Sequence, residues 1–93
     1  MTIAVATDDF KRFVYFRIDN GSMREREEVT VAPGGPSAVA RQFVGLEIDL
    51  LIADRLPEEM KHELFDAGVK LILGVSGRAD ATVAAYLDGS LNF

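Results

Sequence analysis

Cysteine is absent from all 93 residues of this chain. That absence excludes disulfides, thiolate catalysis, zinc fingers and iron–sulfur clusters ligated by cysteine. It also fits a reducing compartment, where thiols stay reduced and disulfides are rare. The composition therefore favours a cytosolic protein without thiol chemistry.

Long apolar runs are missing as well. No segment approaches the roughly 20 apolar residues that a membrane span needs. The first five residues (Met-Thr-Ile-Ala-Val) lack a basic region followed by a long apolar stretch, so we expect no secretory signal peptide. We therefore expect a cytoplasmic location and no membrane contact.

The sequence also lacks a surplus of positive charge. The formal net charge is −5, and the basic residues are interleaved with acids, as in Arg-Glu-Arg-Glu-Glu at residues 24–28. Binding to a phosphate backbone needs Lys and Arg gathered on one face. We therefore expect no nucleic-acid partner, and we interpret residues 24–28 as the solvated side of a strand.

The residues that are present suffice for one domain, spanning residues 1–93, with 48% hydrophobic content to fill one core. The apolar run at residues 3–6 predicts a buried strand. Residues 13–18 are aromatic and β-branched, which favours a second strand. Asn20-Gly21 is a strong hairpin signal, because both residues tolerate positive φ. Residues 24–31 then predict the returning strand, with Val29 and Val31 on one face.

Strands and helices alternate in the rest of the chain. Proline and glycine at residues 33–36 open a helix whose inward residues are Val39, Phe43 and Leu46. Two further helices begin at Pro57 and after residue 77, and their expected inward residues are Met60, Leu64, Ala67, Val83, Tyr86 and Leu87. The apolar runs at residues 50–53 and 69–73 predict buried strands. The element order βββαβαβα predicts an α/β fold with a five-stranded mixed sheet and three helices.

Four parts of the sequence resemble one protein family. Residues 3–9 (Ile-Ala-Val-Ala-Thr-Asp-Asp) are similar to its opening strand and loop, and residues 16–21 to its second strand and hairpin. Residues 67–77 resemble its glycine-plus-apolar strand and small glycine turn, and residues 84–91 its helix ending in Tyr-Leu-x-Gly-x-Leu. The family is that of nitrogenase iron–molybdenum cofactor biosynthesis. The resemblance implies a ribonuclease H-like fold, as a three-layer or two-layer sandwich, and a small metal-cluster carrier, chaperone or scaffold module.

Two loops depart from the family pattern. The family has a longer loop with a His-Phe-Gly element after its first strand, whereas residues 9–13 here pass almost directly into the second strand. After its fourth strand the family often has a glycine-rich turn, sometimes with cysteine, where this chain has Ala-Asp-Arg-Leu-Pro at residues 53–57. Both loops would line a ligand site.

The loops that follow the parallel strands hold the candidate binding residues, because ligands of open α/β sheets bind beyond the carboxyl ends of these strands. The glycine turn before the last helix suits an anion, since the helix start presents unpaired N–H groups. Arginines beside it would add charge-assisted hydrogen bonds. The alternative is that Ser76 only caps the helix and Gly77 only makes the turn. The candidate ligand-binding residues are Thr7, Asp8, Asp54, Arg55, Ser76, Gly77 and Arg78.

Catalytic chemistry has less support in the sequence. Asp8 and Asp54, at the ends of adjacent parallel strands, suggest a Mg²⁺-dependent nuclease, but the first helix supplies no third carboxylate. His62 is expected in solvent, with no partner ligands for a metal. No serine has a partnering base. We therefore expect no enzyme activity, no catalytic residue and no resident metal site.

Two hypotheses follow. In the first, the chain is a non-catalytic carrier that transiently binds an iron–molybdenum or related metal–sulfur cluster, or a small anion, and works with cluster-assembly proteins. In the second, it is a degenerate member without a cluster that acts through protein–protein contact or regulation. An open cleft near Asp8, Asp54 and Arg78 favours the first hypothesis, and a filled surface favours the second.

Overall fold

Three antiparallel strands form the first half of the sheet in a computed structural model, which describes residues 1–7 and 10–89. Strand β1 (Thr2–Thr7) pairs with β2 (Arg12–Asp19), and β2 pairs with β3 (Ser22–Thr30). The hairpin between β2 and β3 turns at Asn20 and Gly21, whose φ angles are 52° and 78°. Positive φ at both positions is what a two-residue hairpin turn requires, as the Asn-Gly pair predicted.

Two short parallel strands complete the sheet. Strand β4 (Leu50–Ile52) pairs in parallel with β1, and β5 (Lys70–Ile72) pairs in parallel with β4. The strand order is β3-β2-β1-β4-β5, so β1 lies at the centre with an antiparallel neighbour on one side and a parallel one on the other. The predicted five-stranded mixed sheet is confirmed.

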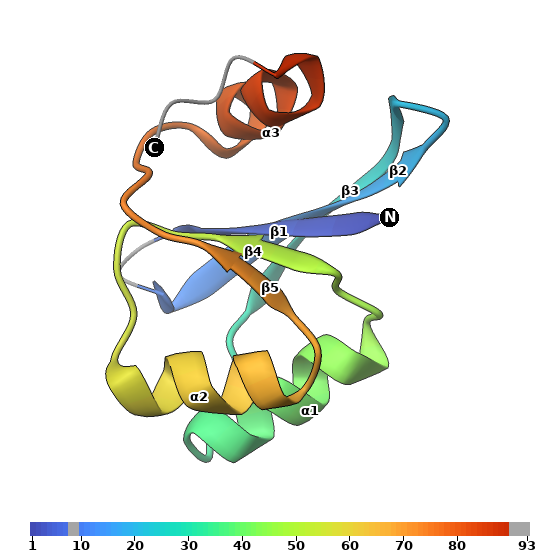
Figure 1. Cartoon of the computed structure of the whole chain (residues 1–93). Helices are drawn as coiled ribbons and strands as arrows, with labels where there is room; N and C mark the ends of the chain where they lie inside the picture. The colour runs from blue at the N-terminus through green and yellow to red at the C-terminus, as the bar shows by residue number, and fades with distance from the viewer. Residues whose placement is uncertain (8–9, 90–93) are drawn as a thin grey trace.

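The helices cover the two faces of the sheet unequally (Figure 1). Helices α1 (Pro36–Gly45) and α2 (Glu58–Asp66) lie on one face, and α3 (Ala79–Asp88) lies on the other. The fold is therefore a three-layer sandwich, compatible with the ribonuclease H-like assignment. None of the described helices is long and apolar enough to cross a membrane.

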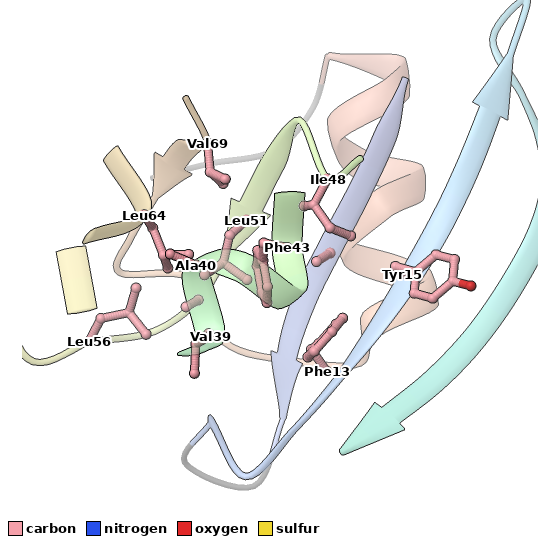
Figure 2. Close-up of a cluster of buried hydrophobic side chains, with 12 residues drawn as sticks. Phe13, Tyr15, Val39, Ala40, Phe43, Ile48, Leu51, Leu56, Leu64 and Val69 are labelled. Carbon is pink, nitrogen blue, oxygen red and sulfur yellow. The ribbon is translucent and has the colours of Figure 1, made fainter. Parts of the chain in front are cut away.

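Each face of the sheet has its own hydrophobic core. Figure 2 shows the larger one, in which Phe13 of β2 and Leu51 of β4 pack against Phe43 of α1. The rings of Phe13 and Phe43 have centroids 4.7 Å apart. On the opposite face, Val83 of α3 packs with Ile3 and other residues of the sheet. Because side chains alternate along a strand, β1 supplies both cores.

The predicted inward residues follow this division. Val39, Phe43, Leu64 and Val83 are at most 1% exposed, and the other five predicted residues of the helices are partly buried against the cores. The expectation that β5 is fully buried was wrong: its residues are exposed or half-buried. Strand β5 lies at the edge of the sheet, so neighbours cover it on one side only.

Asp49 ties the amino ends of the three parallel strands together. Its carboxylate accepts a hydrogen bond from the N–H of Thr2 at 2.8 Å, and its own N–H donates to the Thr2 carbonyl at 2.8 Å. The Asp49 carbonyl accepts from the N–H of Lys70 at 2.9 Å. One residue before β4 therefore fixes β1 on one side and β5 on the other.

We predict that Asp49→Ala lowers the free energy of unfolding by about 1–2 kcal/mol, because the half-buried N–H of Thr2 loses a charged acceptor. Chemical denaturation measures this change. Asp66→Ala is the matched control: it removes an exposed acid of α2 that has no partner within the described residues, and we expect a change within about 0.5 kcal/mol. Equal effects of the two substitutions would contradict the role given to Asp49.

Candidate functional site

The carboxyl ends of the three parallel strands lie along one edge of the sheet. Strands β1, β4 and β5 run in the same direction, and the segments that leave β4 and β5 emerge side by side at this edge (Figure 1). The segment after β4 descends to α2, and the segment after β5 climbs to α3. The edge therefore gathers chain from both helical layers.

Backbone hydrogen bonds continue past the ends of β4 and β5 and hold these two segments together. The N–H of Ala53 donates to the Ile72 carbonyl at 2.9 Å. The N–H of Gly74 donates to the Asp54 carbonyl at 2.8 Å, and that of Val75 donates to Ala53 at 3.3 Å. This ladder fixes residues 53–54 beside residues 72–75.

A cavity of about 280 Å³ opens between these segments and the end of β1. Five of the seven predicted ligand-binding residues line it, and they come from all three predicted loops: Thr7, Asp54, Arg55, Ser76 and Gly77. The remaining wall is formed by Val5, Ala6, Phe10, Ala53, Val75 and Thr82. Residues that are far apart in sequence thus meet in one cavity, because each follows the carboxyl end of a parallel strand.

Of the other two predicted residues, only Arg78 lies within the described part of the chain. Arg78 lines a second cavity of about 390 Å³, which extends from the glycine turn along α3 to Ala85. Asp8 lies outside the described residues. Residues 75–77 line both cavities.

The glycine turn leaves a row of backbone donors at the start of α3. The N–H groups of Ser76, Gly77 and Arg78 donate to no acceptor within the described part of the chain. The first helical hydrogen bond runs from the N–H of Thr82 to the Arg78 carbonyl at 2.9 Å, so the N–H groups of residues 79–81 precede the helical ladder. These donors and the helix dipole favour negative charge.

Ser76 does not cap α3. The N-cap residue is Arg78, and no side chain makes a capping hydrogen bond there. The alternative in which Ser76 serves only as a helix cap was therefore wrong, because the turn places that residue two positions before the N-cap. Ser76 is exposed and lines both cavities, and its hydroxyl makes no hydrogen bond within the described residues.

Thr82 is a site residue that the sequence patterns did not reveal. It is only 5% exposed and lines both cavities. Its hydroxyl makes no hydrogen bond within residues 1–7 and 10–89. In the same residues, every side-chain nitrogen or oxygen atom that is fully buried has a hydrogen-bond partner. The hydroxyl must therefore keep accessible surface, and the cavities are the space that Thr82 lines. A Cβ at Gly77 would lie 4.0 Å from this oxygen.

Phe10 is the second residue that was missed. It lines the cavity with φ of 64°, a left-handed conformation that is unusual for a bulky residue. Its ring packs edge-on against the buried Phe43, with centroids 6.1 Å apart and an angle of 70° between planes. Local sequence signals such as glycine or asparagine, which mark positive φ, are absent at this position.

The charges of the cavity are not engaged with other side chains. Asp54 and Arg55 are both exposed, and no ion pair within the described residues involves either of them or Arg78. Ion pairs form elsewhere, for example between Arg26 and Asp80 at 2.9 Å. Arg55 is therefore available to an anion, while Asp54 can accept a hydrogen bond from a ligand group.

The described residues outside the cavity offer no metal centre. No three His, Cys, Asp or Glu side chains in residues 1–7 and 10–89 are placed to hold a metal ion. His62 is exposed on α2, as predicted, and lines a different hollow with Glu58 and Lys61. There the Lys61 ammonium donates to Glu58 at 3.0 Å, and this hydrogen bond lowers the pKa of the Glu58 carboxyl.

Comparison with known proteins bears on the fold. No family model and no curated protein matches the chain. A solved structure described as "Crystal structure of PH0822" is similar, with a TM-score of 0.85 and 21% sequence identity over 99% of this chain and 95% of that one. At this identity, the likeness establishes the shared α/β fold and nothing about ligand or activity.

We predict that Gly77→Ala lowers the free energy of unfolding by about 1–3 kcal/mol, because φ at this position is +127° and a Cβ disfavours that conformation. Gly45→Ala in α1 is the matched control. Gly45 has no positive φ and open space around it, so alanine there is expected to stabilise the protein by about 0.5–1 kcal/mol. Denaturant titration of both variants measures the difference, and equal shifts would argue against a constrained turn at Gly77.

Proposed function

We propose that this chain is a non-catalytic carrier or scaffold module that holds a small anion or a metal–sulfur cluster in the cavity at the carboxyl ends of β1, β4 and β5. The observation that carries the proposal is that Ser76, Gly77 and Thr82 line one cavity of about 280 Å³, while the first two N–H groups and the Thr82 hydroxyl make no hydrogen bond within the described residues. The family resemblance of the sequence supplies the carrier role. A cytoplasmic location belongs to the same proposal.

The donor set supports an anion more directly than a bare metal ion. Hydroxyl and N–H groups donate hydrogen bonds, and the guanidinium of Arg55 adds positive charge. The chain has no cysteine, so a cluster would be held through hydrogen bonds to its sulfur or oxygen atoms instead of protein thiolates. Oxyanions and thiometallates offer acceptor atoms on all sides and match this set.

The size of the cavity narrows the choice of ligand. Pockets for small molecules usually span about 300–1,000 Å³, so this cavity lies near the lower limit. A single tetrahedral anion is accommodated readily, whereas a large cluster would extend beyond the cavity toward solvent. A small anion is therefore favoured over a large metal–sulfur cluster as the ligand.

We predict stoichiometric binding when the purified protein is titrated anaerobically with tetrathiomolybdate, molybdate or the iron–molybdenum cofactor. Native mass spectrometry reports the bound mass, and calorimetry gives the affinity. Thr82→Val and Arg55→Ala should each weaken binding by about tenfold or more, because each removes a hydrogen bond to a charged ligand.

Arg41→Ala is the matched control, because it changes the net charge as Arg55→Ala does but removes an arginine of α1 that does not line the cavity. The Arg41→Ala variant should bind each probe with the same affinity as the unmodified protein. No binding of any of the three probes at concentrations up to about 1 mM would refute the carrier proposal. The degenerate-member hypothesis, in which the domain acts through protein contacts, would then be the one to pursue.

A further inference from the structure

A third cavity adjoins the proposed anion site. It has a volume of about 430 Å³ and is lined by Phe10, Arg55, Leu56 and Pro57. Phe10 and Arg55 also line the 280 Å³ cavity, so these two side chains form the boundary that both cavities share. A ligand seated in the first cavity therefore has a second space beside it.

The two cavities differ in chemistry. The first is lined by Ser76, Gly77 and Thr82, which can donate hydrogen bonds, and by the charged residues Asp54 and Arg55. In the second, three of the four lining residues are apolar, and Arg55 is the only charged one. Polar recognition on one side and apolar contact on the other is the usual composition of a site for a small organic molecule.

The apolar wall is held in place by the core. The ring of Phe10 packs edge-on against Phe43, which is fully buried. Leu56 is 6% exposed and belongs to the same core cluster. These side chains are therefore already ordered in the folded protein. A ligand that contacts them does not have to immobilise them, which reduces the entropic cost of binding.

Arg55 suits a ligand with both a charged and a flat part. Its guanidinium is exposed and makes no ion pair within the described residues. A planar guanidinium can pair with an anionic group and can also stack on an aromatic face. Its position between the two cavities allows it to contact both parts of one molecule.

Building on the proposed function, we infer that the site takes an organic anion in which a phosphate or carboxylate is joined to one flat apolar ring. The anionic group would occupy the first cavity, against Gly77 and Thr82 at the start of α3. The ring would lie in the second cavity against Phe10, Leu56 and Pro57. A bare inorganic anion would use only the first of these spaces.

Phenyl phosphate and methyl phosphate test this inference, because they share the anionic group and differ in the ring. We expect the complete chain to bind phenyl phosphate about tenfold or more tightly than methyl phosphate, as burial of an aromatic ring predicts. Calorimetry measures both affinities. Amide NMR shifts should change at Gly77 and Thr82 with both ligands, and at Leu56 with phenyl phosphate only.

Two substitutions separate the parts of the site. Phe10→Ala should reduce the affinity for phenyl phosphate to that for methyl phosphate, and Phe10→Leu, which keeps apolar volume against Phe43, should have a smaller effect. Thr82→Val should weaken both ligands by the same factor. Circular dichroism and amide spectra check that each variant is folded, and the comparison of the two ligands on the unmodified chain requires no variant.

Equal affinities of the two phosphates, or shifts confined to residues around Gly77 and Thr82, would overturn the inference and leave anion binding intact. Failure of both phosphates to bind would also overturn it. In that case the titrations with molybdate and tetrathiomolybdate decide separately whether the carrier proposal stands. Tighter binding of phenyl phosphate that Phe10→Ala abolishes would support the inference.

Discussion

The parallel alignment of β1, β4 and β5 is the constraint on which the rest of the structure depends. Strand β1 is central, and its Ile3 and Ala4 are completely buried on opposite faces. Parallel neighbours cannot be joined by a tight turn, so the connections must cross over a face of the sheet, here through α1 and α2. The same alignment brings the carboxyl ends of the three strands to one edge. Layer architecture and cavity thus have a single cause.

The turn has free backbone donors because a loop separates the hydrogen-bond ladder of the sheet from that of α3. The ladder between the parallel strands ends with the N–H groups of Gly74 and Val75, and the ladder of α3 begins with that of Thr82. The N–H groups of residues 76–81 lie between the two ladders and belong to neither. A direct passage from β5 into a helix would leave fewer free donors and no turn around them. The glycine at position 77, with φ of +127°, makes the passage possible.

Sequence patterns predicted the fold well because each signal was local. Asn20-Gly21 specified the hairpin, and helical spacing identified Phe43 and Leu64 as core residues. The exposure of β5 was not predictable in this way, since an apolar run reads alike in a central strand and an edge strand. Only the strand order distinguishes the two.

The site was predictable at the level of loops but not of every side chain. The segments that contribute Thr7, Asp54 and Gly77 were identified because ligands of open α/β sheets bind beyond the carboxyl ends of the parallel strands. Thr82 was missed because it precedes Val83, the expected inward residue, and its burial depends on how α3 is rotated against the sheet. Arg78 faces a neighbouring cavity because the backbone turns at Gly77. Both outcomes are set by tertiary packing, which spacing along the chain does not encode.

The hydroxyl of Thr82 makes no hydrogen bond within the described residues and keeps accessible surface beside the two cavities that this residue lines. A ligand that accepts a hydrogen bond from this hydroxyl would exchange a contact with water for a contact with the ligand, a net gain of about 1.5–3 kcal/mol when the acceptor is charged. The residues that line the cavity offer hydroxyl and N–H groups as donors, the guanidinium of Arg55 and the carboxylate of Asp54. Apart from the carboxylate, these groups recognise ligands that accept hydrogen bonds, which is why an anion is the ligand that we propose.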